Sequence, residues 1–244
     1  MQNPDGGFGS YERSRCGPWL EHLNPAEVFD KIMVEYSYPE CTTAVLTSLA
    51  LFRRYFPDHR ASEIESTTSR AASFVLASQR PDGSWYGAWA ICFTYATFFA
   101  LEALEMILQT YQTSHKARKA DDWLVAQQKS DGGWGEHYSS CELETYVQHD
   151  ESQVVNTSWA VLALILARYP DAEKIRSGLQ VGDPTVCLGR KAAFLAIAIT
   201  DANDLHSCSW IAKNRTGNGS RRTSKGYSIV HGKYAKRENL GIRY

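Results

Sequence analysis

The sequence predicts an all-α fold, and two observations carry that prediction. Apolar residues recur at helical spacing through the first 180 residues, and no segment alternates apolar and polar residues as a half-buried strand does. A turn motif recurs three times between the helical segments, which is typical of helix pairs that stack on one another. We therefore expect stacked helix pairs and no sheet.

Helical periodicity marks five segments. The third is apolar on nearly all sides, as a buried inner helix is, and the fifth has Asn156 as its expected N-cap and Pro170 beyond its end. The first stops at Pro57, which cannot continue a helix. In chain order, the segments are marked by residues 45–56, 64–75, 88–108, 120–124 and 159–166.

The repeated turn has the pattern Gln-x-x-Asp-Gly-x-aromatic and lies at residues 2–8, 79–85 and 128–134. The second and third copies also share a lead-in segment, which begins nine residues before the glutamine. The repeated unit is therefore sixteen residues long, and its two copies start 49 residues apart. Asp-Gly supplies a tight turn, and the aromatic ring packs over it. The glutamine amide can satisfy backbone groups at a helix end or at the next helix start. Each copy is therefore predicted to join two helices.

Composition describes an ordinary globular chain. Apolar residues make up 43%, and 26 basic against 27 acidic residues leave a net charge of −1. That balance argues against a cationic nucleic-acid binder. The longest nearly uncharged stretch, residues 88–101, is too short to span a bilayer, and the first residues do not resemble a signal peptide. Six widely spaced cysteines are expected to be reduced thiols.

Charge divides the chain near Gln180. Residues 1–180 hold 15 basic and 23 acidic side chains, a net of −8, whereas residues 181–244 hold 11 and 4, a net of +7. The second part is also rich in glycine and serine. We expect an irregular basic tail that is not a native domain, arising from a reading-frame change, a retained intron or a faulty gene model. Binding to nucleic acid or to an acidic membrane is its alternative role.

The motifs resemble those of a known family. The three turns correspond to the QW motifs of the squalene and oxidosqualene cyclases, and four segments, three of which overlap a turn, look like the fungal lanosterol synthase type. These segments are QNPDGGFGSYE (2–12), EYSYPECTTA (35–44), GSWYGAWAICFTY (83–95) and GGWGEHYSSCE (132–142). The resemblance covers about 180 residues, in the later part of that family's C-terminal domain.

The resemblance implies a fold and an activity. The family forms α/α barrels, sits monotopically on the endoplasmic reticulum membrane or lipid droplets, and cyclises 2,3-oxidosqualene to lanosterol without a cofactor or metal. Residues 1–180 would then be a partial α/α barrel domain. Carbocation chemistry needs an acid to protonate the epoxide and aromatic faces to stabilise the cations.

Four residues are placed at the site by this resemblance. Trp89 and Tyr95 would lie on the inner helix facing the cavity, with Trp89 as a cation–π platform, and Tyr11 would line the cavity near the first rings. Cys41 would hydrogen-bond the catalytic aspartate. Trp89 and Tyr95 also fit the role of core aromatics, and Cys41 that of a small buried thiol. The run His149-Asp150-Glu151 fits a solvated loop better than an acid/base cluster.

The chain departs from the family at both ends. The acid motif Asp-Cys-Thr-Ala-Glu does not occur in it, and the context of Glu40-Cys41 identifies the partner-cysteine segment instead. After Gln180 the expected helix and fourth turn are replaced by Val-Gly-Asp-Pro. We therefore expect the chain alone to be inactive.

Other classes remain as alternatives. A protein prenyltransferase β-subunit would need a zinc site of Asp, Cys and His, and the sequence offers no convincing set. A squalene–hopene cyclase, or a cyclase that forms protostadienol or cycloartenol, would differ in acid motif or product. The non-enzymatic alternative is an α/α repeat that binds a lipid or a partner.

Overall fold

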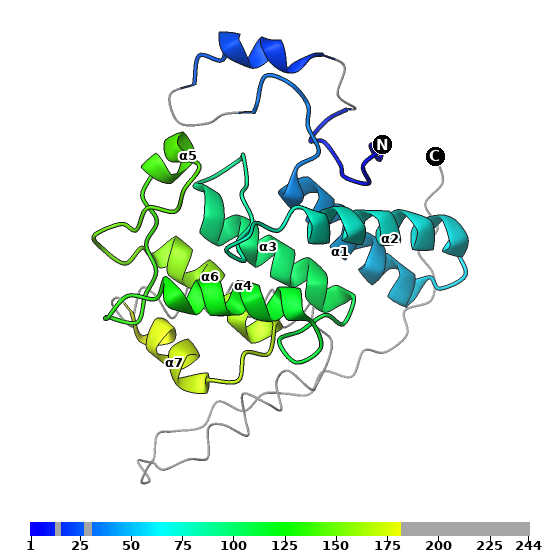
Figure 1. Ribbon diagram of the computed structural model, residues 1–244. Helices are drawn as coiled ribbons and strands as arrows, with labels where there is room; N and C mark the ends of the chain where they lie inside the picture. Colours follow the sequence, from blue (N-terminus) through cyan, green and yellow to red (C-terminus); the bar gives the residue numbers. More distant parts are fainter. Residues whose placement is uncertain (13–15, 27–30, 182–244) are drawn as a thin grey trace, which may run out of the picture.

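The computed structural model describes residues 1–12, 16–26 and 31–181 (Figure 1). It confirms the all-α prediction, because the only strand-like pairings in these ranges are isolated bridges between Phe8 and Tyr38 and between Glu136 and Gln148. The predicted tail lies outside the described residues. The helices are η1 (Pro18–Leu23, a 3-10 helix), α1 (Pro39–Tyr55), α2 (Ala61–Ala77), α3 (Cys92–Met106), α4 (His115–Ala126), α5 (Ser139–Leu143), α6 (Val154–Leu166) and α7 (Ala172–Gln180).

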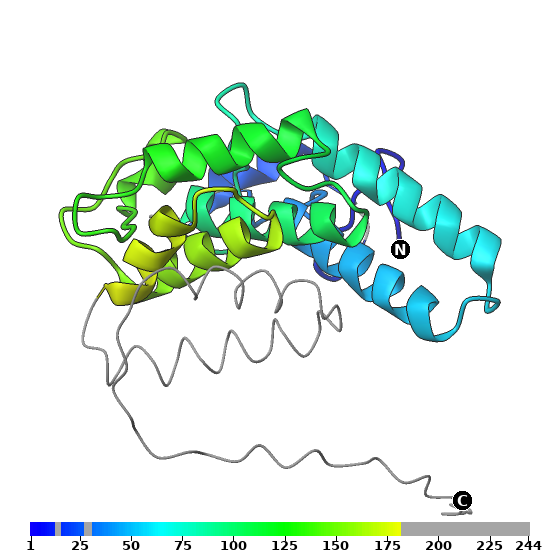
Figure 2. The same cartoon turned by 90° about the horizontal axis from the view of Figure 1, so that it is seen from below.

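The helices form two layers. Helices α1, α3 and α6 pack side by side with α3 in the middle (Figures 1 and 2). Helix α2 packs mainly against α1, α4 packs against α3 and α6, and α7 packs against α6. Helix α3 is buried on nearly every side, as its apolar sequence predicts. Paired helices in an inner and an outer layer are the α/α arrangement of the family that the motifs indicate. No helix within the described ranges is long and apolar enough to cross a membrane.

Two predicted helix starts are wrong. Helix α3 begins at Cys92 rather than at Ala88, because residues 88–91 form a loop held by side chains from elsewhere in the fold. Helix α6 has Gln153 as its N-cap, and Asn156 lies inside the helix, where its amide donates to the Gln153 side chain. Two caps follow the usual chemistry, since Ser114 and Asp171 accept backbone N–H groups at the starts of α4 and α7.

The three turns fasten the layers together in the same way. Each glutamine Nε2 donates to the carbonyl of its own turn glycine, at 2.8–2.9 Å, and to a carbonyl of an outer helix, at 2.8–3.0 Å. The outer helix is the next one along the stack. The pairs are Gln2 with Thr67 on α2, Gln79 with Lys116 on α4, and Gln128 with Lys174 on α7.

The glycine and the aromatic residue complete each turn. Gly83 has a φ of +108°, and a Cβ there would lie 2.5 Å from the Lys119 carbonyl oxygen, so glycine is required. Trp85 and Trp134 are completely buried, and each indole donates at 2.7 Å to a carbonyl ten residues earlier. The prediction that a turn joins two helices is confirmed for the second and third copies, which lie between α2 and α3 and between α4 and α5. The first copy fastens its segment to α2 through Gln2.

Candidate active site

The four residues predicted for the site lie near the N-terminal ends of α1 and α3. Cys41 is in the first turn of α1, and Tyr95 is in the first turn of α3. Tyr11 follows the first repeated turn, where its neighbour Ser10 reaches the Cys41 sulfur with its hydroxyl at 3.5 Å. Trp89 lies in the loop before α3, and its N–H donates to the Tyr95 hydroxyl oxygen at 2.9 Å. The fold thus brings together segments that lie far apart in the sequence.

Trp89 and Tyr11 expose their rings. Trp89 is 45% exposed and lies in the loop before α3, so its predicted place on the inner helix is wrong. Its ring contacts that of Tyr38 edge-on, at 5.6 Å between centroids. Tyr11 is 88% exposed, and its N–H is held by the Glu35 carboxylate at 3.1 Å. Aromatic surface is therefore open at this end of the helices.

Tyr95 faces the interior instead. It is 3% exposed, and its ring contacts those of Phe99 and Trp159. Its hydroxyl donates to the Glu40 carboxylate and accepts the N–H groups of Trp89 and Ala90. Burial raises the pKa of the Tyr95 hydroxyl, and the Glu40 charge raises it further. Tyr95 thus keeps its proton, and its oxygen is fully engaged within the protein.

Glu40 is a hydrogen-bond acceptor and not the exposed acid that its sequence context imitates. It is buried in the first turn of α1, and its Oε1 accepts the N–H groups of Ala88 and Trp89 as well as the Tyr95 hydroxyl. All three partners lie 48 to 55 residues away in the sequence. No local signal in Glu40-Cys41-Thr42 points to them.

Cys41 is a free, half-buried thiol. Burial raises its pKa, while the hydrogen bond with Ser10 acts in the opposite direction. The net effect keeps the sulfur protonated at neutral pH, so that it can donate a hydrogen bond. A thiol that can donate a hydrogen bond is what the resemblance implies for the partner of the catalytic acid.

Glu136 is an important residue that the sequence did not identify. Its carboxylate is completely buried and accepts the N–H groups of Cys92, Phe93 and Thr94, at 2.8–3.1 Å, together with the Thr94 hydroxyl. These are the unpaired amides at the start of α3, where the helix dipole favours a negative charge. Burial raises the pKa of Glu136, and the backbone N–H groups oppose the rise.

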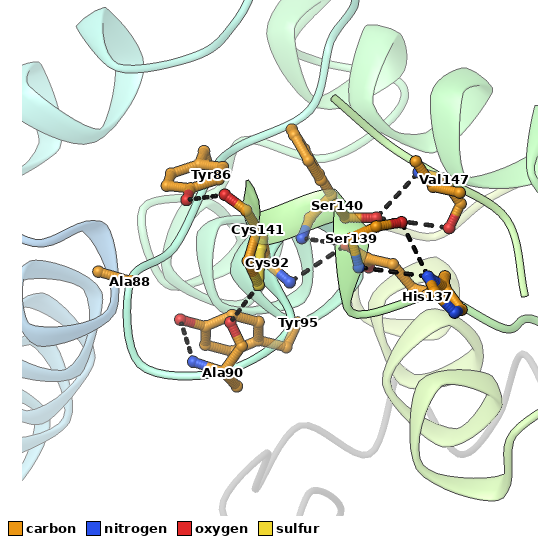
Figure 3. The surroundings of a disulfide bond; sticks show 12 residues. Tyr86, Ala88, Ala90, Cys92, Tyr95, His137, Ser139, Ser140, Cys141 and Val147 are labelled. Carbon is orange, nitrogen blue, oxygen red and sulfur yellow. Dashed lines mark hydrogen bonds between the residues drawn. A yellow bond between two sulfur atoms is a disulfide. The ribbon is translucent and has the colours of Figure 1, made fainter. Parts of the chain in front are cut away.

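A disulfide joins Cys92 to Cys141 next to this network, so the prediction of six reduced thiols is wrong for these two (Figure 3). Their Cα atoms lie 5.9 Å apart because α5 packs against the start of α3. Figure 3 shows the bond among the loop residues Tyr86 and Ala90, with the Tyr86 hydroxyl directed to the Cys141 carbonyl at 3.4 Å. The separation of 49 residues gave no indication of pairing.

The remaining acidic run is structural. His149 and Glu151 lie in a loop where the His149 ring accepts the Glu151 N–H, and Lys129 donates to the carbonyls of His149 and Asp150. This confirms the interpretation as a loop. Over the described ranges, no group of three or more His, Cys, Asp or Glu side chains could hold a metal ion.

Comparisons with known proteins agree with the architecture. The model of the squalene-hopene cyclase C-terminal domain matches residues 1–183. Lanosterol synthase erg7A of Aspergillus fumigatus is 54% identical over 181 residues, which are 74% of this chain and 24% of that protein. Human lanosterol synthase is 47% identical over 183 residues, 74% and 25% of the two chains, and lanosterol synthase ERG7 of Saccharomyces cerevisiae is 49% identical over 176 residues, 72% and 24%.

The length of the matched region limits what the comparisons show about this chain. The chain spans about a quarter of the length of these curated relatives. The match ends at about the residue where the charge of the sequence changes sign. The repeated turns, the paired helices and the family match all fall in the same residues, and the chain therefore belongs to the squalene and oxidosqualene cyclase family, within that family's C-terminal domain.

Proposed function

We propose that residues 1–181 form part of the cavity wall of an oxidosqualene cyclase, an isomerase that converts 2,3-oxidosqualene into a lanosterol-type triterpene. The observation that carries this proposal is how three chain segments meet. Ser10, the neighbour of Tyr11, contacts the Cys41 sulfur. Glu40, the neighbour of Cys41, binds the Trp89 N–H and the Tyr95 hydroxyl. Identity of about half to lanosterol synthases supports the substrate class.

The proton in this reaction comes from an acid outside these residues, because the family's acid motif does not occur in the sequence. The Cys41 thiol, kept protonated by its burial, donates a hydrogen bond to the carboxylate of that acid. Such a bond stabilises the carboxylate and lowers the pKa of the acid, which favours transfer of its proton to the epoxide. The chain alone is expected to turn over no substrate.

The aromatic residues act after protonation. The Trp89 face stabilises a passing carbocation by about 2 kcal/mol when water is excluded, which corresponds to roughly thirtyfold in rate. Tyr95 lies behind this surface, 3% exposed, and its oxygen is occupied by Glu40 and two N–H groups. An engaged oxygen does not attack the cation and does not trap it as an ether.

We also propose that the enzyme rests on a membrane or lipid-droplet surface, as the family does on the endoplasmic reticulum. The η1 segment supports this, because Trp19 and Leu23 expose apolar side chains there, and Met33, whose N–H binds Glu21 of η1, exposes another. Such side chains insert at the level of the lipid headgroups. Flotation of the chain with phospholipid vesicles tests the proposal, and the variant with Trp19→Ser and Leu23→Ser should lose most of the vesicle-bound fraction.

A chimera tests the cyclase proposal directly. Residues 1–181 replace the matching segment of the Aspergillus fumigatus lanosterol synthase, and products from 2,3-oxidosqualene are measured by gas chromatography and mass spectrometry in detergent. We expect a tetracyclic alcohol, and a rate roughly thirtyfold lower with Trp89→Ala. Trp19→Ala is the matched control, since it also removes an exposed indole and should keep the rate. A folded chimera that forms no cyclised product contradicts the proposal.

A further inference from the structure

Three consecutive amides before α3 are bound by two side chains. Glu40 Oε1 accepts the N–H of Ala88 at 2.7 Å and that of Trp89 at 3.1 Å. The Tyr95 hydroxyl oxygen accepts the N–H of Trp89 at 2.9 Å and that of Ala90 at 3.1 Å. The same hydroxyl donates to Glu40 Oε1. The hydrogen bonds that the structure gives to these amides thus all end on Glu40 or Tyr95.

Space for this network depends on the neighbouring glycine. A Cβ on Gly87 would collide with the Tyr95 hydroxyl and would lie 2.8 Å from Glu40 Oε1. The loop returns to the helix just beyond, where the Gly87 N–H donates to the Cys92 carbonyl at 3.0 Å. The carboxylate and the phenol therefore lie against the backbone, away from bulk water.

Charge makes Glu40 the dominant member of the network. A carboxylate that accepts several N–H or O–H groups in a buried setting makes stronger hydrogen bonds than a neutral acceptor does. Tyr95 cannot replace it, because the phenol needs an acceptor for its own proton. Removing the carboxylate would leave the N–H of Ala88 without its acceptor and the phenol proton unpaired.

We propose that Glu40 is a positioning residue, which fixes loop 88–90 and the ring of Trp89 through two backbone amides and the Tyr95 hydroxyl. The role of this positioning in catalysis rests on the proposed cyclase function. Glu40 acts through other residues: its partners are backbone and phenol, and the side chain that it positions is the exposed indole of Trp89. Cation–π stabilisation falls quickly with distance, so a loose loop would weaken it at this ring.

Hydrogen exchange of the whole 244-residue chain tests the inference without reference to activity. With Glu40→Ala we expect the amides of Ala88 and Trp89 to exchange at least about tenfold faster, since they lose the carboxylate that accepts them. The amide of Ala90 should exchange faster as well, because its acceptor, the Tyr95 hydroxyl, loses its own partner. Unchanged exchange at these amides in a folded variant overturns the proposal. Exchange in α3 beyond its first turn serves as the internal measure that the variant has folded.

Glu21 provides a matched control. Its Oε1 also accepts two consecutive amides, those of Met33 and Val34, both at 3.0 Å. Its Oε2, like that of Glu40, is buried without a hydrogen-bond partner in the described structure. Glu21→Ala should therefore accelerate exchange at residues 33 and 34 and leave residues 88–90 unchanged. Equal acceleration of residues 88–90 by both variants would contradict a specific role for Glu40.

A second variant keeps the test decisive if Glu40→Ala does not fold. Tyr95→Phe removes the phenol oxygen, so Ala90 should exchange fast while Ala88 stays protected by Glu40. Glu40→Gln keeps a neutral acceptor and should produce a smaller acceleration than Glu40→Ala. Loss of protection at Ala88 in Tyr95→Phe would show that the loop does not depend on Glu40.

The chimeric cyclase supplies the chemical readout. We expect Glu40→Gln to lower kcat and to raise the share of incompletely cyclised products, with KM unchanged, because binding surface is kept and cation placement is lost. Faster exchange with unaltered kcat and products overturns the positioning role in catalysis. An inactive parent chimera rejects the cyclase proposal, whereas the exchange experiment still decides whether Glu40 fixes the loop.

Discussion

Residues 70–92 and 119–141 are two copies of one unit, and their turns make matching contacts. The indole N–H groups of Trp85 and Trp134 donate to carbonyls ten residues earlier at the same distance. The backbone N–H of each tryptophan donates to a threonine hydroxyl of an inner helix. Cys92 and Cys141 occupy equivalent positions, each seven residues after the tryptophan, and are joined to each other. Contacts inside the motif are thus repeated faithfully.

The copies differ at positions outside the motif. Where the first copy has Ala72, a partly buried residue of α2, the second has Asp121, completely buried in α4 with no hydrogen-bond partner for either oxygen among the described residues. Two residues after the tryptophan, Gly87 leaves room for Glu40 and Tyr95, whereas Glu136 reaches the start of α3. The repeated motif thus maintains the helix pairs, whereas the buried carboxylates and their hydrogen bonds are set by residues outside the motif.

The largest expected effect is common to both copies. Trp85→Ala and Trp134→Ala should each lower the free energy of unfolding by about 4 kcal/mol, because each removes a fully buried indole and leaves a cavity. Urea denaturation followed by circular dichroism measures both. Values that differ by more than about 2 kcal/mol would show that the copies are not energetically equivalent.

The disulfide between the copies comes next. Cys141→Ser should lower the free energy of unfolding by about 3 kcal/mol, since the bond closes a long loop in the unfolded chain. A thiol titration of the unreduced, denatured protein should also gain two groups after reduction. If the titration is the same with and without reductant, the bond between the copies does not form in solution. Cys16→Ser is the control, as Cys16 is an exposed free thiol.

Asp121 should make stability depend on pH. Burial, together with the neighbouring Asp122, raises the pKa of Asp121 to about 9. Between its ordinary pKa and this value the folded protein holds one proton more than the unfolded chain, so stability falls as pH rises. A full proton corresponds to about 2 kcal/mol between pH 6 and 7.5. Asp121→Asn should remove this slope, and Asp122→Asn should leave most of it; equal slopes in wild type and Asp121→Asn contradict the assignment.

The turn glycines should show a moderate effect. Gly83→Ala and Gly132→Ala should each cost about 2 kcal/mol, because both have positive φ and both would place a Cβ against the backbone of the next helix. Thermal unfolding measures the loss. Gly17→Ala should cost less, because its φ is −78° and the new Cβ would meet only the exposed ring of Trp19, at 2.9 Å. A neutral result at Gly83 would mean that the helix beside the turn can move away.

The smallest effect concerns the glutamines. Gln79→Ala and Gln128→Ala should each cost about 1 kcal/mol, the net value of side-chain hydrogen bonds to backbone carbonyls. The Gln128 Nε2 shares its two hydrogens among both carbonyls and the Ser177 hydroxyl, at 3.0 Å, so the loss at Gln128 should be slightly larger. Equilibrium denaturation of the two variants in parallel tests the order. The reverse order would indicate that α7 is held mainly by other contacts.

The predictable part of the site came from likeness to a family rather than from spacing. Cys41, Trp89 and Tyr95 were identified through the segments that carry them, and the structure places them near one another. Neither the loop position of Trp89 nor the engaged hydroxyl of Tyr95 followed from the pattern. The start of α3 depends on Glu40 and Glu136, which come from distant parts of the chain and cannot be read from the apolar run at residues 88–108.

The sequence by itself determined the helix pairs and the turns that join them. Both are local features, because helical periodicity and an Asp-Gly turn each depend on residues that are close together in the sequence. The tertiary structure decided where the buried charges go: Glu40 and Glu136 reach amides 42 to 49 residues away, and Asp121 is buried without a partner. A buried carboxylate is stabilised by whichever donors packing brings to it, and that is a property of the assembled helices rather than of spacing along the chain.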